Sequence, residues 1–259
     1  MPNDRYGQKW SEEETILAFY RYCQVPLSKA TSDHPDIIRL AELLGRTTGS
    51  VRLKFSNLAH FDPNAKSRNI SGMSHGSRFD EIVTKQFWND WEGLVFKAME
   101  IEADLQGTTV EELVSDTRDM PVGATIDRTT RARVGQTFFR EAVLSAYQQK
   151  CCITGLAVPS LLIASHIKPW SKSDPCTERT NPANGLCLNG LHDRAFDQGL
   201  ITVLPDYTVR VSSRLHMQST DDPGVAWLLA CDRQEIRKPD RFLPKREFLE
   251  YHNEVIFRP

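Results

Sequence analysis

The sequence predicts an α+β protein, with a helical N-terminal domain and a C-terminal domain of short strands and helices. Apolar residues recur at helical spacing over most of residues 8–62, whereas short apolar runs separated by turn residues fill much of 160–212. Between these regions, residues 101–127 carry seven acidic and one basic side chain. The predicted division is a helical domain over 1–102, an acidic linker over 103–127 and a mixed domain over 128–259.

Three helices are predicted in the N-terminal domain. The first follows Ser11, a candidate N-cap with acidic residues in the turn after it. The second, in HPDIIRLAELLG, has Pro35 near its start and Gly45 as its stop. The third, GSVRLKFSNLAHF, follows the short turn RTT. A helix, a turn of a few residues and a second helix is the layout of a helix-turn-helix, a motif that binds DNA.

The turn and the third helix carry basic side chains and no acidic ones. Arg46, Arg52 and Lys54 lie in this stretch and are the predicted DNA contacts of the domain. A helical hairpin that packs on its neighbours and binds nothing has the same spacing, so the pattern alone leaves both interpretations open.

Two further helical segments follow. RFDEIVTKQFWNDWEGLVFKAMEIEADL is predicted as one helix whose aromatic side chains belong to a core or an interdomain stripe rather than to a base-stacking platform. Another helix is predicted over about 134–149. Arg131 and Arg133 stand at its start and favour phosphate contacts, although such a basic run is usually a solvated face.

Bulk composition narrows the function classes. The formal net charge is −2, yet residues 128–259 carry 18 basic and 14 acidic side chains, so a polyanion would meet the C-terminal half. No run approaches the roughly 18 apolar residues of a membrane span, and the N-terminus lacks the apolar core of a signal peptide. Six cysteines without a framework spacing are expected to be reduced thiols, and the protein is expected to be cytoplasmic, without a membrane partner.

The C-terminal region places three polar side chains on neighbouring predicted elements. SLLIASHI is a predicted strand with His166 near its end, and Asn184 opens a second strand, NGLCL. NGLHDRAFDQG is a predicted helix that carries His192, and LITVL and YTVRVSS form a hairpin after it. A lone histidine at a strand end is usually structural, but these three residues are expected to meet at one cleft.

SHIKPW, followed by NPANGLCL and LHDRAFD, resembles the His-Asn-His (HNH) endonucleases of the ββα-metal superfamily, above all their restriction endonuclease branch. The resemblance covers about 128–255, and IIRLAELLGRTTGSVRLKFSNLAHFDP is similar to the leader region of that branch. It implies a ββα-metal nuclease domain in which His166 is the general base, His192 a metal ligand and Asn184 a brace that orients His166. Lys168 and Arg194 are the implied phosphate contacts.

Phosphodiester hydrolysis explains these residue types. Histidine, with an ordinary pKa near 6.5, accepts a proton from water near neutral pH, and a divalent cation offsets charge on the phosphate and the leaving oxygen. The resemblance implies Mg²⁺ or Mn²⁺, held by a few protein ligands and several waters. Ser165 stands where many relatives have an aspartate ligand and is the second candidate ligand, while Phe196 stands where some have a further one.

Many relatives also carry two Cys-x-x-Cys pairs that hold zinc. Here Cys151 keeps one sulfur, whereas Thr154, Leu188 and Leu191 occupy the other three positions. Four thiolates cannot be assembled from this set, and no structural zinc is predicted.

The predicted function is a metal-dependent endonuclease of double-stranded DNA. The resemblance implies restriction of foreign DNA, with methylated DNA as one substrate alternative. Since one such site cuts one strand, cleavage of both strands would require a homodimer or two binding events. Two alternatives stay open: a non-catalytic DNA-binding protein with a degenerate HNH fold, favoured by Ser165 and Phe196, and an interaction protein without affinity for nucleic acid.

Overall fold

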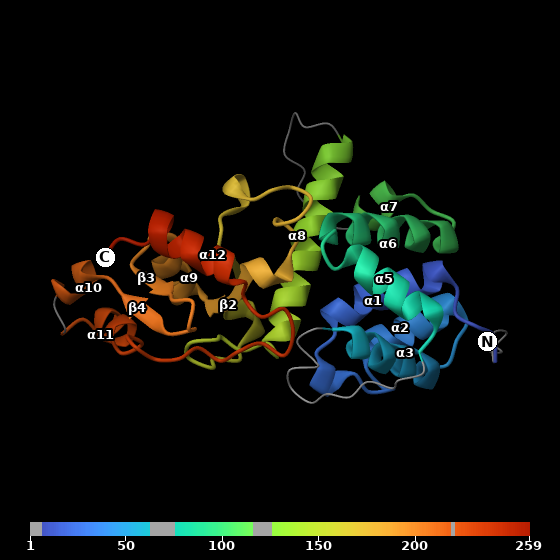
Figure 1. The fold of residues 1–259 in the computed structure, drawn as a ribbon, viewed down its shortest axis with the longest axis horizontal. Helices are drawn as coiled ribbons and strands as arrows, with labels where there is room; N and C mark the ends of the chain where they lie inside the picture. The colour runs from blue at the N-terminus through green and yellow to red at the C-terminus, as the bar shows by residue number, and fades with distance from the viewer. Residues whose placement is uncertain (1–6, 63–75, 116–125, 219–220) are drawn as a thin grey trace. The chain divides into compact units, whose positions relative to one another are not determined.

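The computed structural model describes residues 7–62, 76–115, 126–218 and 221–259 of the 259-residue chain. These residues form an α+β fold, with two small antiparallel sheets in the C-terminal part (Figure 1), which confirms the predicted fold class. The chain divides into two compact units, Met1–Ala142 with Asp174–Asn181 and Val143–Ser173 with Pro182–Pro259. We call them the helical unit and the mixed unit.

The helical unit is built from helices whose ends carry the predicted caps. Its described elements are α1 (Glu12–Gln24), the 3₁₀ turn η1 (Leu27–Lys29), α2 (Pro35–Leu44), α3 (Thr48–Phe61), α5 (Arg78–Phe87), α6 (Trp91–Gln106), α7 (Val110–Ser115) and most of α8 (Ile126–Ala146). Ser11 Oγ accepts a hydrogen bond from Glu14 N, and the Glu14 carboxylate accepts one from Ser11 N, so the N-cap prediction is confirmed. Gly45 ends α2 in the left-handed conformation, at φ 61°.

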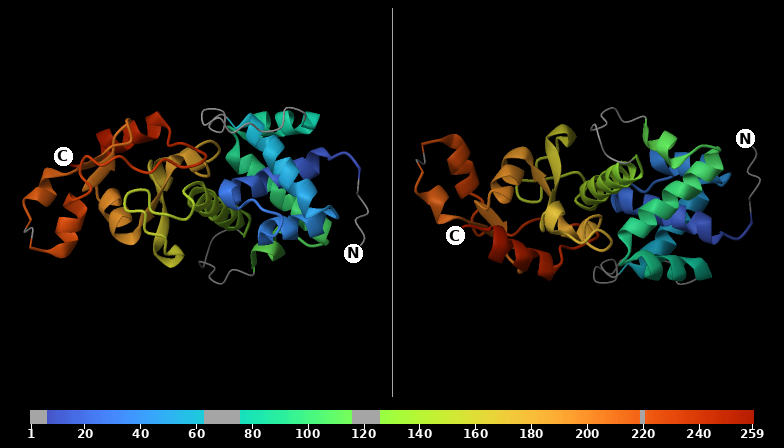
Figure 2. Two further views of the ribbon diagram at one scale, coloured as in Figure 1. Left: turned by 90° about the horizontal axis from the view of Figure 1, so that it is seen from below. Right: turned by 90° about the horizontal axis from the view of Figure 1, so that it is seen from above.

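The two helices predicted on either side of the short turn are present. α2 and α3 pack on each other and on α1, and these blue helices lie together in both views of Figure 2. The side chain of Thr47 caps α3 by accepting a hydrogen bond from Ser50 N. This is the order of elements found in a helix-turn-helix, and DNA binding by it stays a prediction.

The aromatic-rich segment forms two helices rather than the single helix predicted. α5 ends at Phe87 and α6 begins at Trp91, because Asp90 leaves the helical conformation (φ −135°, ψ 68°) and its carboxylate accepts a hydrogen bond from Gly93 N. The predicted acidic linker also contains helix, since α6 continues to Gln106 and α7 follows it. Residues 116–125 of that linker lie outside the described residues, and the domain boundaries at 102 and 128 stay predictions.

An aromatic cluster forms the core of the helical unit. The ring of Phe19 lies within 6.3 Å of the rings of Tyr22, Trp88 and Trp91, measured between centroids. Trp91 in turn stacks on Phe138 of α8. Phe87 and Trp91, at most 4% exposed, are thus core residues, as predicted, whereas Phe79 and Phe96 are half-buried.

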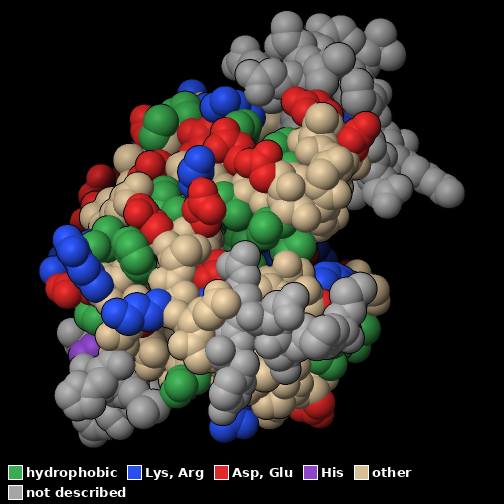
Figure 3. All heavy atoms as spheres, turned by 90° about the vertical axis from the view of Figure 1, so that its right-hand side faces the viewer, with side chains coloured by type: hydrophobic (Ala, Val, Ile, Leu, Met, Phe, Trp, Pro, Cys, Tyr) green, Lys and Arg blue, Asp and Glu red, His purple; other side chains and the backbone are tan. Residues whose placement is uncertain are grey.

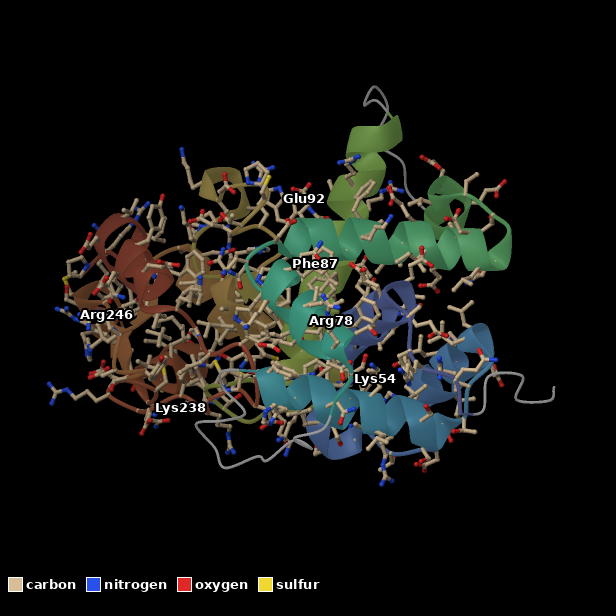
Figure 4. All side chains as sticks on the ribbon, turned by 45° about the vertical axis from the view of Figure 1, so that its right-hand side comes forward. Lys54, Arg78, Phe87, Glu92, Lys238 and Arg246 are labelled. Carbon is tan, nitrogen blue, oxygen red and sulfur yellow. The ribbon has the colours of Figure 1, made fainter. Side chains whose placement is uncertain are left out.

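Two of the predicted DNA contacts, Arg46 and Lys54, lie inside the helical unit. The Lys54 ammonium pairs with the Asp80 carboxylate, and both side chains are at most 1% exposed; Figure 4 shows Lys54 where α3 meets α5. The Arg46 guanidinium donates to the buried Glu14 carboxylate at 2.7 and 3.1 Å. Charges that are buried and paired in this way cannot reach a phosphate, so both residues are excluded from the DNA-contact set. Arg52 is on the exposed side of α3.

The mixed unit contains the predicted strand–strand–helix order. Its elements after the end of α8 are η2 (Pro159–Leu161), β1 (Leu162–His166), η3 (Trp170–Lys172), η4 (Pro182–Asn184), β2 (Gly185–Asn189), α9 (Gly190–Asp197), β3 (Ile201–Val203), β4 (Val209–Val211), α10 (Ser213–His216), α11 (Pro223–Leu229), α12 (Arg246–Tyr251) and the π-helical turn η5 (His252–Ile256). β1 and β2 pair antiparallel, with Leu162 opposite Asn189 and His166 opposite Gly185. β3 and β4 form the predicted hairpin, and α9 packs on both strands of the first sheet.

No helix in the described part of the chain is long and apolar enough to cross a membrane.

The buried Lys54–Asp80 pair predicts that loss of Lys54 will destabilise the fold. Lys54→Ala leaves the Asp80 carboxylate buried without its counter-charge and should lower the free energy of unfolding by about 3–5 kcal/mol. Lys85→Ala, which breaks the exposed pair with Glu81, should cost less than about 1 kcal/mol. Urea denaturation of the two variants measures both values, and equal losses would contradict the assignment of Lys54 to the core.

Candidate functional site

Asn184, directly before β2, forms hydrogen bonds with the segment that follows β1. Its side chain is fully buried. Its Oδ1 accepts a hydrogen bond from Lys168 N at 2.8 Å, and its Nδ2 donates to Lys168 O at 3.1 Å and to Ser173 Oγ at 3.3 Å. Its main-chain oxygen accepts from Ile167 N at 2.9 Å. Asn184 therefore fixes the main chain directly after His166, and its role in orienting the imidazole stays a prediction.

His166 is the last residue of β1 and directly precedes the segment that Asn184 holds. Its side chain is half-buried, and its ring meets the ring of Trp170 edge to face, with centroids 5.5 Å apart and an interplanar angle of 87°. The partial exposure leaves the imidazole accessible to water and to a substrate. A general base requires this access, together with a fixed main chain.

His192 lies on α9 and is fully buried. Its Nδ1 lies 2.8 Å from Nδ2 and 3.0 Å from Oδ1 of Asn189, and the ring of Trp227 packs against it edge to face at 4.8 Å. Its Nε2 is buried with no hydrogen-bond partner among the described residues. Burial lowers the pKa of His192 to about 4, so the ring is neutral at neutral pH, the form that binds a metal ion.

Ser165, like His192, has a buried polar atom without a hydrogen-bond partner of normal geometry in the described structure. This atom, Oγ, nevertheless lies close enough to the Asp193 carboxyl to lower the pKa of that group. Burial is the larger effect and raises the pKa of Asp193. The pKa of Asp197 is raised, first by burial and then by the charge of Asp193.

The two predicted metal ligands thus each present an unsatisfied buried atom. A buried polar atom without a partner is costly, and an ion or a water molecule is the usual explanation. The described residues contain no group of three or more histidine, cysteine or acidic side chains arranged to hold a metal ion. His192 and Ser165 therefore fit a divalent cation that takes most of its ligands from water and substrate, as Mg²⁺ does.

Phe196, at the position of a further ligand in some relatives, packs against His252. The two rings stack at 3.6 Å with an interplanar angle of 13°. His252 Nε2 lies 3.2 Å from the Phe196 carbonyl oxygen, which accepts only, so Nε2 carries the proton. Nδ1 then accepts from the Thr202 hydroxyl at 2.8 Å. Both ring nitrogens are engaged, and His252 is a packing residue.

Asn189 is a residue of the site that sequence reasoning missed. Its Oδ1 caps α9 by accepting hydrogen bonds from the main-chain N–H groups of Leu191 and His192, and its Nδ2 donates to Cys151 Sγ and Thr154 Oγ1. An asparagine directly before a predicted helix is a typical N-cap, and this signal was present in the sequence. All six cysteines of the chain are free.

The remaining predicted DNA contacts are distributed over both units. In the mixed unit, Arg194 is exposed on α9, and the Lys168 ammonium lies over the ring of Tyr251 at 5.4 Å from its centroid. In the helical unit, the Arg131 guanidinium packs over the ring of Phe96 at 3.7 Å, and Arg133 is half-buried. Figure 3 shows acidic, basic and hydrophobic side chains interspersed on one face of the molecule, without a continuous basic patch there.

Comparison with known families agrees with this geometry. Residues 151–204 match the family model described as HNH endonuclease. The matched segment spans β1, β2, α9 and all three motif residues, so the mixed unit contains an HNH domain. No curated protein matches the chain. An HNH domain suggests a nuclease or DNA-binding function, with DNA as the implied substrate.

The burial of His252 predicts how the stability of the protein depends on pH. Burial lowers its pKa to about 4, against about 6.5 in an unfolded chain. Below about pH 6.5 the unfolded state binds a proton that the folded state does not, so stability falls as the pH drops towards about 4, by up to roughly 1.4 kcal/mol per pH unit. His192 adds a similar loss.

His252→Gln should remove about half of this loss, because one of the two buried histidines is gone while the amide can replace both hydrogen bonds. Urea denaturation near pH 7 and near pH 5, with chelator present, measures the slope. An unchanged slope in the variant would contradict a neutral buried His252.

Proposed function

We propose that the protein is a metal-dependent endonuclease of double-stranded DNA, with the HNH domain as its catalytic part. The observation that carries the proposal is the buried, unpartnered Nε2 of His192, on a helix that packs against the strand ending in His166. The unpartnered Oγ of Ser165 on that strand adds to it. An HNH fold that kept only a packing role would have no reason to leave these two atoms unsatisfied.

In the proposed reaction, His166 accepts a proton from a water molecule as the water oxygen bonds to phosphorus. The bond from phosphorus to the 3′-oxygen breaks on the opposite side, and the leaving oxygen takes a proton from solvent water, which gives 5′-phosphate and 3′-hydroxyl ends. Asn184 holds the main chain beside His166 and so keeps the imidazole in position. Lys168 and Arg194 bind neighbouring phosphates.

His192 and Ser165 would hold the divalent cation, Mg²⁺ or Mn²⁺. When bound, such a cation offsets the negative charge that develops on the phosphate and on the leaving oxygen. Their small number fits a metal that keeps several water ligands.

The helical unit would recognise the DNA through α3. Its exposed side carries Arg52 and no acidic residue, and Arg131 and Arg133 would add phosphate contacts. The biological role that follows is restriction of foreign DNA in the cytoplasm, with methylated DNA as an alternative substrate. A homodimer would supply the second site needed to cut both strands.

The main test is digestion of methylated and unmethylated plasmid with Mg²⁺, Mn²⁺, Co²⁺ or Ni²⁺. His166→Ala should lower the cleavage rate by about 10²-fold or more, because it removes the general base. DNA affinity should be unchanged in a gel shift. If the unsubstituted protein cuts neither plasmid with any of the four metals, the endonuclease proposal is wrong.

The full burial of His192 favours one other function, a non-catalytic DNA-binding protein with a degenerate HNH fold. The same experiment separates the two. That protein would shift a DNA probe in a salt-dependent way and leave both plasmids intact.

Arg52 gives a prediction about the helical unit. Arg52→Ala should weaken DNA binding and make the slope of log affinity against log salt shallower by about 1, since one phosphate contact is lost. The control is Arg39→Ala, which removes an exposed arginine of α2 that pairs with Asp36 at 3.8 Å and should leave the slope unchanged. Equal slopes in both variants would contradict a DNA contact at Arg52.

A further inference from the structure

Asn189 connects three parts of the mixed unit through one buried amide. It is 3% exposed and is both the last residue of β2 and the N-cap of α9. Its Oδ1 lies 3.1 Å from Leu191 N and 3.0 Å from His192 N. Its Nδ2 lies 3.4 Å from Cys151 Sγ and from Thr154 Oγ1. The same amide contacts the His192 ring at Nδ1.

These contacts fix which end of the amide is oxygen. The two main-chain N–H groups of Leu191 and His192 can only donate, so the atom that faces them must be Oδ1. The two protons of Nδ2 are then directed to Cys151 and Thr154, which can accept. In a flipped amide, the NH₂ group would face the N–H groups of Leu191 and His192, so donors would meet donors. The contacts of Nδ2 with Cys151 and Thr154 hold the side chain in the same orientation.

The fixed orientation of the Asn189 amide helps to determine which ring nitrogen of His192 carries the proton. His192 Nδ1 lies 2.8 Å from Nδ2 and 3.0 Å from Oδ1 of this amide, so the ring nitrogen either accepts from Nδ2–H or donates to Oδ1. The second arrangement leaves the Nδ2 protons to Cys151 and Thr154 and avoids a buried Nε2–H without an acceptor. The ring proton is then on Nδ1, and the lone pair of the buried Nε2 is free. The opposite tautomer would bury an Nε2–H donor for which no acceptor lies within hydrogen-bond distance in the described structure.

We infer that Asn189 is a positioning residue that holds His192 in the Nδ1–H tautomer and so presents Nε2 to the catalytic metal ion. The inference rests on the proposed function for the metal, while the tautomer itself does not depend on it. Ligating histidines commonly donate their second ring N–H to a fixed acceptor, and the loss of such acceptors lowers metal affinity by about 10- to 100-fold. The 151–154 turn contributes by fixing the acceptor rather than by touching the metal.

Two substitutions at Asn189 separate this role from helix capping. Asn189→Ser keeps an N-cap oxygen, but its side chain is too short to place an acceptor beside the imidazole. Asn189→Asp keeps both the cap and an acceptor for Nδ1–H, and it loses the donor to Cys151 and Thr154. Thr154→Val is the matched control, because it removes one partner of the amide and leaves Oδ1 in place.

The first measurement is the ring tautomer of His192 in the metal-free full-length protein, from NMR spectra of the imidazole nitrogens. The second is Mn²⁺ affinity, from electron paramagnetic resonance of the free ion. Asn189→Ser should lose the Nδ1–H tautomer and bind Mn²⁺ about 10-fold or more weakly. Asn189→Asp and Thr154→Val should keep the tautomer and stay within about threefold of the unsubstituted protein.

An Asn189→Ser protein with an unchanged tautomer and unchanged Mn²⁺ affinity would overturn the inference. So would an Asn189→Asp protein that is folded and loses the tautomer. Failure of the proposed metal site gives a different result, in which His192→Ala and the unsubstituted protein bind Mn²⁺ equally weakly. In that case the NMR measurement still decides the role of Asn189.

Discussion

The pairing of β1 with β2 is the interaction on which the rest of the site depends. It sets His166 opposite Gly185 and Leu162 opposite Asn189. All five residues of β2 are buried, and a shift of the register by one residue would turn every side chain to the other face. An asparagine stands at each end of this strand. Asn184, just before it, fastens the chain after His166, and Asn189, at its end, fastens His192. A short strand thus positions two histidines that are 26 residues apart in the sequence.

Burial divides the polar groups of the molecule into two kinds. Arg46 and Lys54 in the helical unit are buried and paired with carboxylates, so their charges contribute to the fold and are withheld from a ligand. Ser165 Oγ and His192 Nε2 are buried without a hydrogen-bond partner of normal geometry in the described structure, and a bound ion or water molecule would offset the free-energy cost of burying them. The contrast explains why basic residues in a helix-turn-helix segment are weak evidence for DNA contacts, whereas two unsatisfied atoms in an HNH domain are stronger evidence for a ligand.

Local sequence signals predicted much of the fold. Ser11 and Gly45 marked helix ends, and the order of His166, Asn184 and His192 indicated the strand–strand–helix unit. The break between α5 and α6 was missed because the apolar spacing continues through it, and only the capping bond of Asp90 interrupts the helix. The burial of Arg46 and Lys54 could not be predicted, since their carboxylate partners lie 32 and 26 residues away. The role of Asn189 depends likewise on the 151–154 turn, which is distant in the sequence.

A metal site with few protein ligands has a consequence for how the proposed enzyme would select its substrate. If His192 and Ser165 supply the protein ligands, the cation completes its coordination with water and with oxygens of the scissile phosphate. Metal and DNA then each raise the affinity for the other by the same factor. The site would be weakly loaded without DNA, and the metal would be retained where a phosphate is correctly seated beside His166. In such a site, a serine at position 165 in place of a carboxylate would lower the metal affinity of the free protein, so that metal binding would depend more on the substrate.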